Sequence, residues 1–281
     1  MTRDLRRKHA EINGIKLAYV DEGEGSPVVL LHGFPDSADL WRNQVSTLVN
    51  AGRRVIAPDL RGFGESDAPA DVDSYQILNS AADVLGLCDH LKIGRMALVG
   101  HDWGSALGWA LAAFAADRVE RYVGISVGHP ATFVGEDFEQ REKSWYMLFF
   151  QFEGVAEEWL RADDWANLRA WVTSGVRRAD DLDRWIADLS RPGRLEASLG
   201  WYRANVPPSS WVGDSAFVFP PVACPVMGVW SSADMALTEG QMTRSASNVS
   251  GDFRYERIDG VSHWIPVEAP DQLNALLLDF L

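Results

Sequence analysis

The residues most suited to chemistry lie in the motif Gly-His-Asp-Trp-Gly at residues 100–104, which has Asp102 at its centre. The apolar run that precedes the motif, residues 96–99, predicts a short buried strand. Residues 105–113 are small and apolar and predict a helix. A strand, a tight turn and a helix form the setting in which a nucleophile is held on a strained turn. Asp102 is therefore the candidate nucleophile.

A carboxylate in this position favours a particular reaction. Attack of Asp102 on a carbonyl would give an anhydride, which is a poor route for ordinary esters. Attack on a saturated carbon that carries a leaving group gives an alkyl ester of the enzyme, which water can then hydrolyse. The pattern thus favours displacement at an sp3 carbon followed by ester hydrolysis. The alternative is that Asp102 only caps the helix that follows it.

Hydrolysis of such an ester requires a base, and His263 is the best placed of the six histidines. It lies in the predicted loop between the last strand, residues 253–258, and the closing helix, residues 270–281. Asp234 follows the predicted strand at residues 225–230 and can orient this histidine. Nucleophile, acid and histidine then follow the chain order of α/β-hydrolase catalytic triads. Taken singly, His263 and Asp234 would each be better explained by a structural role, and their positions along the chain favour the catalytic one.

An oxyanion forms during ester hydrolysis and needs hydrogen-bond donors. The backbone N–H of Trp103, directly after the nucleophile, is one candidate donor. The second is expected from the loop His-Gly-Phe-Pro at residues 32–35, and Phe34 is the candidate there. We expect a cis peptide bond before Pro35. His101 neighbours the nucleophile but is expected to point away from it.

Apolar segments alternate with helical patterns along most of the chain, which predicts an α/β protein with a mostly parallel sheet flanked by helices. Residues 131–215 differ, because they contain seven of the twelve tryptophans and show amphipathic helical patterns at residues 157–171 and 180–189. We expect residues 1–130 and 216–281 to form the α/β core and residues 131–215 to form an inserted helical cap over the strand ends.

Composition narrows the function further. The 281-residue chain has a formal net charge of −14, which argues against nucleic acid and anionic membranes as partners. Its two cysteines, Cys88 and Cys224, suggest small core residues rather than a disulfide framework or a metal site. The basic N-terminus is not followed by an apolar stretch, so it does not predict a signal peptide. We expect a soluble, cytoplasmic protein without cofactor or metal; an oligomer is left open.

These motifs together resemble the α/β-hydrolase fold family. The motif around Asp102 resembles that of two groups within it, epoxide hydrolases and haloalkane dehalogenases, which share the aspartate nucleophile and differ in the leaving group. A halide departs as a stable anion and needs only weak N–H donors. An epoxide oxygen departs as an alkoxide and needs strong donors, for which tyrosine, with a pKa of about 10, is suited.

The resemblance to epoxide hydrolases implies two tyrosines in the cap. Residues 144–151 are similar to the segment that holds the first, here Tyr146, and residues 201–203 are similar to the segment that holds the second, here Tyr202. Either tyrosine taken alone could equally be a half-buried helix residue. Phe34 stands where haloalkane dehalogenases usually have asparagine, which counts against that group.

The predicted function is an epoxide hydrolase that opens a small, largely apolar epoxide with water to a vicinal diol, through a covalent ester on Asp102. Tyr146 and Tyr202 hold the epoxide oxygen, and His263, oriented by Asp234, activates water. One alternative is a haloalkane or haloacid dehalogenase with the same triad, although the chain has no convincing clamp for a substrate carboxylate. Another is a ligand-binding homologue without activity, against which the intact triad argues.

Overall fold

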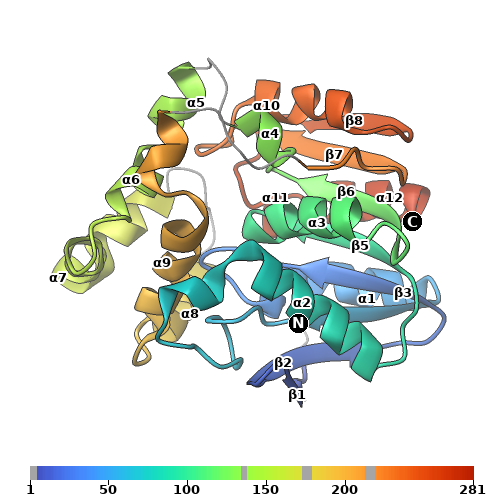
Figure 1. Cartoon of the computed structure of the whole chain (residues 1–281), viewed down its shortest axis with the longest axis horizontal. Coiled ribbons are helices and arrows are strands. Elements are labelled where there is room, and N and C mark those ends of the chain that lie inside the picture. Colours follow the sequence, from blue (N-terminus) through green and yellow to red (C-terminus); the bar gives the residue numbers. More distant parts are fainter. Residues whose placement is uncertain (1–4, 134–137, 173–178, 213–218) are drawn as a thin grey trace.

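The computed structural model describes residues 5–133, 138–172, 179–212 and 219–281. These described residues form a sheet of eight strands in the order β1-β2-β4-β3-β5-β6-β7-β8 (Figure 1). The pairs β1–β2 and β2–β4 are antiparallel, and the other neighbouring strands are parallel. The strands are β1 (Lys8–Ile12), β2 (Ile15–Glu22), β3 (Ser26–Leu31), β4 (Arg53–Pro58), β5 (Met96–His101), β6 (Val119–Ile125), β7 (Val226–Ser231) and β8 (Phe253–Ile258).

The segment at residues 11–20 alternates around an Asn-Gly pair, which predicts a β-hairpin, and the structure confirms it. β1 and β2 are joined by a two-residue turn in which Asn13 and Gly14 have φ angles of 51° and 80°. Asparagine and glycine tolerate this left-handed region, and a turn of this kind matches the twist of the strands it joins. The sequence Asn-Gly therefore sets the register of the first two strands.

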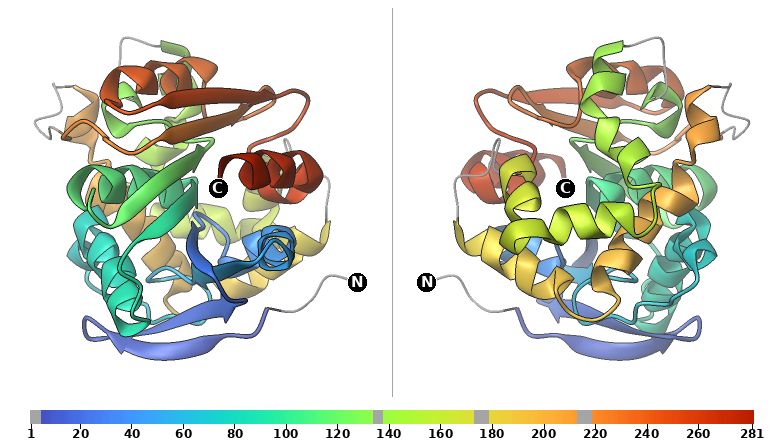
Figure 2. Two further views of the ribbon diagram at one scale, coloured as in Figure 1. Left: turned by 90° about the vertical axis from the view of Figure 1, so that its right-hand side faces the viewer. Right: turned by 90° about the vertical axis from the view of Figure 1, so that its left-hand side faces the viewer.

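Helices cover both faces of the sheet, as predicted for a parallel sheet with apolar strands. The two views of Figure 2 show α1 (Arg42–Asn50) and α12 (Pro270–Phe280) on one face, and α2 (Ile77–His90) and α3 (Trp103–Phe114) on the other. The central strand β5 is buried along its whole length. The α/β class and the mostly parallel sheet expected from the sequence are thus confirmed.

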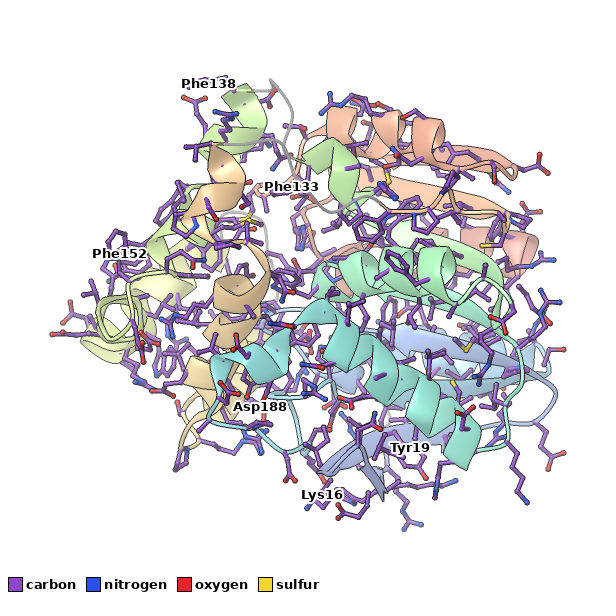
Figure 3. The ribbon with its side chains drawn as sticks, viewed as in Figure 1. Lys16, Tyr19, Phe133, Phe138, Phe152 and Asp188 are labelled. Atoms are coloured by element: carbon purple, nitrogen blue, oxygen red, sulfur yellow. The ribbon has the colours of Figure 1, made fainter. Side chains whose placement is uncertain are left out.

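The described residues between β6 and β7 are mainly helical, and most of them lie beside the strand ends, at the left of Figure 1. Residues 130–211, as far as they are described, are called the helical segment below. Phe152 is 62% exposed and lies on the outer side of this segment (Figure 3). Its elements are α4 (Pro130–Phe133), α5 (Phe138–Lys143), α6 (Trp145–Phe149), α7 (Val155–Val172), α8 (Ala179–Leu189), α9 (Arg194–Asn205) and the 3-10 turn η3 (Pro208–Trp211).

One of the two helices predicted in this segment differs from expectation. The helix at residues 180–189 corresponds to α8. The prediction of a continuous helix at residues 157–171 is wrong. The chain leaves helical geometry at Ala162 of α7, and Asp163, Asp164 and Trp165 have positive φ angles. Aspartate tolerates such angles better than most residues, and Trp165, where the chain re-enters the helix, is buried. Periodicity alone does not reveal such a break.

The predicted division into core and cap stays a prediction. Its first boundary, residue 130, coincides with the start of α4. Its second boundary, between residues 215 and 216, lies outside the described residues. Among the described helices, none has both the length and the apolar character needed to cross a lipid bilayer.

Candidate active site

Asp102 occupies a strained turn between β5 and α3, with φ and ψ of 55° and −124°. Gly100 and Gly104 make this turn possible: an added Cβ at Gly100 would lie 2.2 Å from the carbonyl oxygen of Gly104, and one at Gly104 would lie 2.1 Å from that of Leu31. The Asp102 side chain forms no capping hydrogen bond with the helix that it precedes. The capping alternative therefore does not describe what this carboxylate does.

The loop at residues 32–35 brings a backbone donor to the Asp102 carboxylate. The N–H of Phe34 donates to Asp102 Oδ1 at 2.8 Å. Gly33 permits this approach, because a Cβ there would lie 2.2 Å from Asp102 Oδ1 and 2.6 Å from the backbone nitrogen of Trp103. Trp103 begins α3, so its N–H has no acceptor within its own helix. The predicted donors thus lie beside the nucleophile, and the peptide bond before Pro35 is cis as expected.

The predicted histidine and acid lie next to each other and next to Asp102. His263 Nδ1 is 2.9 Å from Asp234 Oδ2, and His263 Nε2 is 3.6 Å from Asp102 Oδ2. The second oxygen of Asp234 accepts the N–H groups of Ala236 and Leu237 at 2.8 and 2.9 Å. Asp234 is thereby fixed by its own loop and can orient the imidazole.

The two carboxylates control the charge of His263. Burial by itself would lower the pKa of His263, but the negative charges of Asp234 and Asp102 outweigh burial and raise this pKa to about 10. Burial would likewise raise the pKa of Asp234, but the imidazolium and two backbone amides lower it. At neutral pH the site therefore holds an imidazolium ion between two carboxylates.

This charge distribution gives a testable result. Replacement Asp102→Asn removes one of the two negative charges that stabilise the imidazolium, so the pKa of His263 should fall below the value of about 10. Titration of the imidazole followed by NMR measures this change. The exposed carboxylate of Glu196 provides a control, because Glu196→Gln should leave the His263 titration unchanged. An unaltered pKa in the Asp102→Asn protein would show that the two side chains are not coupled.

His101 has a contact that sequence analysis missed. It does not line the cavity described below, but its ring lies 4.6 Å from that of His263, between centroids, and its Nε2 is 2.9 Å from the His263 carbonyl oxygen. Burial and the nearby charge of His263 lower the pKa of His101 to about 4. Neutral His101 therefore supports the loop that carries His263. No local pattern predicts this contact between β5 and a loop far along the chain.

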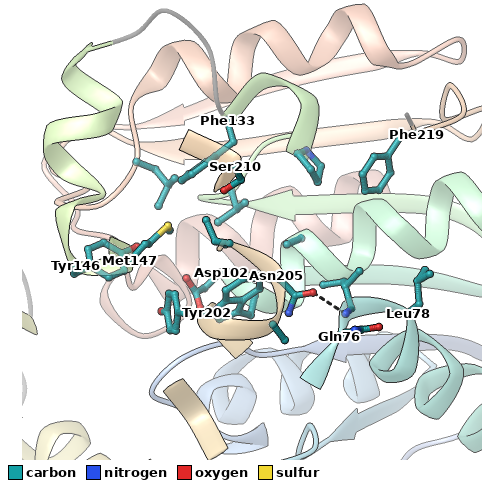
Figure 4. Close-up of a pocket in the computed structure, with 18 residues that line it drawn as sticks. Gln76, Leu78, Asp102, Phe133, Tyr146, Met147, Tyr202, Asn205, Ser210 and Phe219 are labelled. Carbon is teal, nitrogen blue, oxygen red and sulfur yellow. Dashed lines mark hydrogen bonds between the residues drawn. The ribbon is translucent and has the colours of Figure 1, made fainter. Parts of the chain in front are cut away.

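Tyr146 and Tyr202 come from two helices of the helical segment and lie next to each other. Their rings lie 5.8 Å apart between centroids, and both side chains line the same cavity as Asp102 (Figure 4). Burial is the main reason why the pKa of each phenol lies well above 10, and the negative charge of Asp102 adds to the effect. Both phenols are consequently neutral and keep their protons for hydrogen bonding.

The cavity beside Asp102 has a volume of about 430 Å³. In Figure 4 it extends from Tyr146, Tyr202 and Asp102 toward Leu78 and Phe219. Leu78 is half exposed, so this end is open to solvent. Sequence analysis did not identify the rest of the wall, which is mostly apolar and includes Ala106, Val127, Pro130, Phe133, Met147, Val206 and Leu237.

The described residues include no group of three or more His, Cys, Asp or Glu side chains arranged to hold a metal ion. Cys88 and Cys224 are both free and buried.

The chain was compared with protein families, with known proteins and with solved structures, and it is similar to several of them. Residues 26–270 match the family described as alpha/beta hydrolase fold. Epoxide hydrolase A of Mycobacterium tuberculosis is 32% identical, and the match covers 96% of this chain and 95% of the relative. The crystal structure of Epoxide Hydrolase A from Mycobacterium thermoresistibile is similar with a TM-score of 0.84 at 30% identity, over 98% of both chains. An inhibitor complex of Bacillus megaterium epoxide hydrolase is similar with a TM-score of 0.88 at 26% identity, over 97% of this chain and 99% of the other.

Proposed function

This chain belongs to the α/β-hydrolase fold family and is an epoxide hydrolase, and we propose that it forms a vicinal diol through a covalent ester on Asp102. One observation carries the assignment of residues. The Asp102 carboxylate lies between the Phe34 amide and His263, and two neutral phenols line the same cavity. The site therefore combines a nucleophile, donors for a departing alkoxide and a base for water.

Ring opening uses the two oxygens of Asp102 differently. Oδ1 accepts the Phe34 N–H, whereas Oδ2 is 3.6 Å from His263 Nε2, which is longer than an ordinary hydrogen bond. Oδ2 attacks a ring carbon, the carbon–oxygen bond of the epoxide breaks, and an alkyl ester forms. The released oxygen takes a proton from Tyr146 or Tyr202. Each phenol is neutral before ring opening and can therefore supply that proton.

Ester hydrolysis uses the rest of the site. Once Asp102 is alkylated it has lost its negative charge, so the pKa of His263 falls below the resting value of about 10. The imidazolium then gives up its proton, which restores the phenol that protonated the alkoxide, and neutral His263 is available as the base. His263 Nε2 takes a proton from water, and the water oxygen attacks Cγ of Asp102. Negative charge collects on Oδ1, where Phe34 and Trp103 donate. The bond between Cγ and Oδ2 then breaks, and Oδ2 takes a proton from the imidazolium and leaves as the second hydroxyl of the diol. Asp102 keeps one oxygen from water and becomes a carboxylate again as it returns a proton to His263.

An isotope experiment tests this pathway. In a single turnover in H₂¹⁸O, with enzyme in excess, the diol should contain no heavy oxygen, and Asp102 should gain it. Direct attack of water on the epoxide would label the diol in the first turnover and would contradict the covalent route.

A second experiment distinguishes an epoxide hydrolase from a dehalogenase with a panel of substrates: styrene oxide, alkyl epoxides, bromoalkanes and fluoroacetate. Halide is measured beside diol, because halide release without diol would favour the dehalogenase alternative.

The tyrosines should act in ring opening alone. Tyr146→Phe or Tyr202→Phe removes one donor and little volume, and each change should slow ring opening by up to about 10²-fold, since the remaining phenol still donates. The double replacement should cost about 10³-fold, because the alkoxide is left without a side-chain donor. Hydrolysis of the ester depends on the Phe34 and Trp103 amides and should stay near normal. Rapid-mixing measurements of the two steps test this.

Tyr75 provides the matched control for these replacements. It is buried and its hydroxyl donates to the carbonyl oxygen of Pro69, away from the cavity. Tyr75→Phe should leave ring opening unchanged in any molecule that folds. If the Tyr146/Tyr202 double variant opened epoxides at the wild-type rate, both tyrosines would be structural.

The wall of the cavity supports a small, largely apolar epoxide as substrate. The expected cytoplasmic location stays a prediction. The free, buried Cys88 and Cys224 are in keeping with a reducing compartment.

A further inference from the structure

Helix α8 contributes no residue to the wall of the cavity, within the described part of the chain. It nevertheless contacts the two loops that carry Phe34 and His263. Arg184 of α8 forms an ion pair with Asp36, which follows the cis Phe34–Pro35 bond. Trp185, the next residue of α8, packs against Trp264, which follows His263. This helix is therefore placed to affect the site without contacting the substrate.

The pair between Arg184 and Asp36 is bidentate. Nη1 of Arg184 is 2.6 Å from Asp36 Oδ1, and Nη2 is 3.3 Å from Asp36 Oδ2. The Asp36 side chain is only 2% exposed, and that of Arg184 is 25% exposed. Asp181 fixes the guanidinium from the other side at 3.0 Å and is itself paired with Arg42 at 2.8 Å. The guanidinium thus has a defined position rather than a free choice of rotamers.

The turn that contains Phe34 is closed by Asp36. The N–H of Asp36 donates to the carbonyl oxygen of Gly33 at 2.9 Å, so the Phe34 peptide lies inside the turn. The same Phe34 N–H donates to Asp102 Oδ1 at 2.8 Å. A shift of the buried Asp36 carboxylate would therefore shift the amide that faces the nucleophile.

A second contact connects α8 with the histidine loop. The rings of Trp185 and Trp264 lie 5.2 Å apart between centroids and are inclined by 34°. Trp264 in turn lies 5.2 Å from the ring of His263. Both groups that act on the ester, the Phe34 amide and the His263 imidazole, are thus supported by adjacent residues of one helix.

The two chemical steps place opposite demands on the Phe34 amide. During ring opening the carboxylate of Asp102 transfers negative charge to the substrate, so a donor to Oδ1 stabilises the starting state more than the transition state. During hydrolysis a full negative charge develops on Oδ1, and the same donor stabilises the transition state. Displacement of the amide should therefore slow hydrolysis and leave ring opening little changed.

We propose that Arg184 is a positioning residue for ester hydrolysis, which acts through Asp36 to hold the Phe34 amide against Asp102. The inference rests on the proposed two-step function. It assigns the ring-opening tyrosines to α6 and α9 and the support of the hydrolytic groups to α8, so that different helices of the helical segment serve different steps.

The test compares Arg184→Met with wild type in single-turnover experiments with styrene oxide. Intact protein mass follows the alkyl-enzyme, and diol is measured in parallel. Ring opening should stay within about threefold of wild type. Hydrolysis should slow by about tenfold, less than the loss of about 10²–10³-fold that removal of an oxyanion donor causes. The alkyl-enzyme should therefore accumulate in the variant.

Three further variants sharpen the comparison. Arg184→Lys keeps the charge without the planar fork and should restore part of the hydrolysis rate. In an Asp36→Asn background, Arg184→Met should have little additional effect, because the partner through which Arg184 acts is already neutral. Arg161→Met removes an exposed ion pair with Glu196 in the same helical segment and should change neither step.

The outcomes separate the inference from the proposed function. Equal slowing of both steps by Arg184→Met, or unchanged hydrolysis, would overturn the positioning role while the wild-type ester still supported the two-step mechanism. A wild-type enzyme that formed diol with heavy oxygen from H₂¹⁸O in its first turnover would instead overturn the mechanism itself. If Arg184→Met does not fold, Arg184→Lys and the Asp36→Asn/Arg184→Met pair give the same decision, because they leave no unpaired carboxylate buried.

Discussion

The replacement Asp102→Ala should abolish epoxide turnover and leave the fold intact. Alanine cannot form the ester, and the remaining groups cannot open the ring by another route. The loss should be at least about 10⁴-fold, the scale observed when a nucleophile or its partners are removed from other enzymes. Little packing is lost, because the Asp102 side chain lines the cavity. Diol formation gives the rate, and circular dichroism with thermal unfolding reports on the fold.

Two comparisons make the Asp102 result decisive. Asp102→Asn keeps the shape of the side chain on the strained turn and should be similarly inactive. Asp89→Ala, which removes an exposed carboxylate paired with Arg118, should retain activity. Near-normal turnover in a folded Asp102→Ala protein would show that the nucleophile is elsewhere.

The replacement His263→Gln should stop the enzyme after the first step. Ring opening needs the Asp102 carboxylate but no base, so the ester should still form. Glutamine cannot take the proton from water, and hydrolysis should fall by about 10²–10⁴-fold, the usual contribution of a general base. After mixing with epoxide, the intact mass should rise by one substrate and remain raised. In wild type the same mass should appear only transiently.

The His263 variant needs its own control, because it leaves Asp234 without its imidazole partner. Asp234 is buried, although two backbone amides still stabilise its charge. Thermal unfolding therefore has to accompany the kinetics. Asp234→Asn provides the second variant: hydrolysis should again be the slower step, since the imidazole loses the group that orients it. A folded His263→Gln protein whose mass does not change with substrate would contradict the two-step mechanism.

Local patterns in the sequence were sufficient to predict the sheet and the order of the triad residues along the chain. Apolar runs bounded by turns predicted the parallel strands, and Asn13-Gly14 predicted the hairpin. Glycines around Asp102 predicted the strained turn, because only small neighbours permit such close approach of the backbone. Asp102, Asp234 and His263 were expected together because their order along the chain is that of an α/β-hydrolase triad. The parallel strands that precede them bring these distant residues to one edge of the sheet.

The tyrosines could be proposed only from resemblance to known enzymes. Nothing in the local pattern around Tyr146 or Tyr202 distinguishes a donor at the cavity from a buried helix residue. Their position depends on how α6 and α9 pack over the strand ends, and their high pKa depends on the burial and charge that this packing creates. The break in α7 was not predictable either, because the buried residues on both sides of it keep a helical spacing.

Pairings between distant residues were decided by the tertiary structure alone. Arg184 and Asp36 are 148 residues apart, and each by itself predicts no more than a charged surface residue. The contact of His101 with His263 and the raised pKa of His263 also arise between residues that are distant in the sequence. The chain sequence determines each backbone turn through local sterics, whereas the charge and position of a buried group depend on which distant groups the folded chain brings within a few ångströms of it.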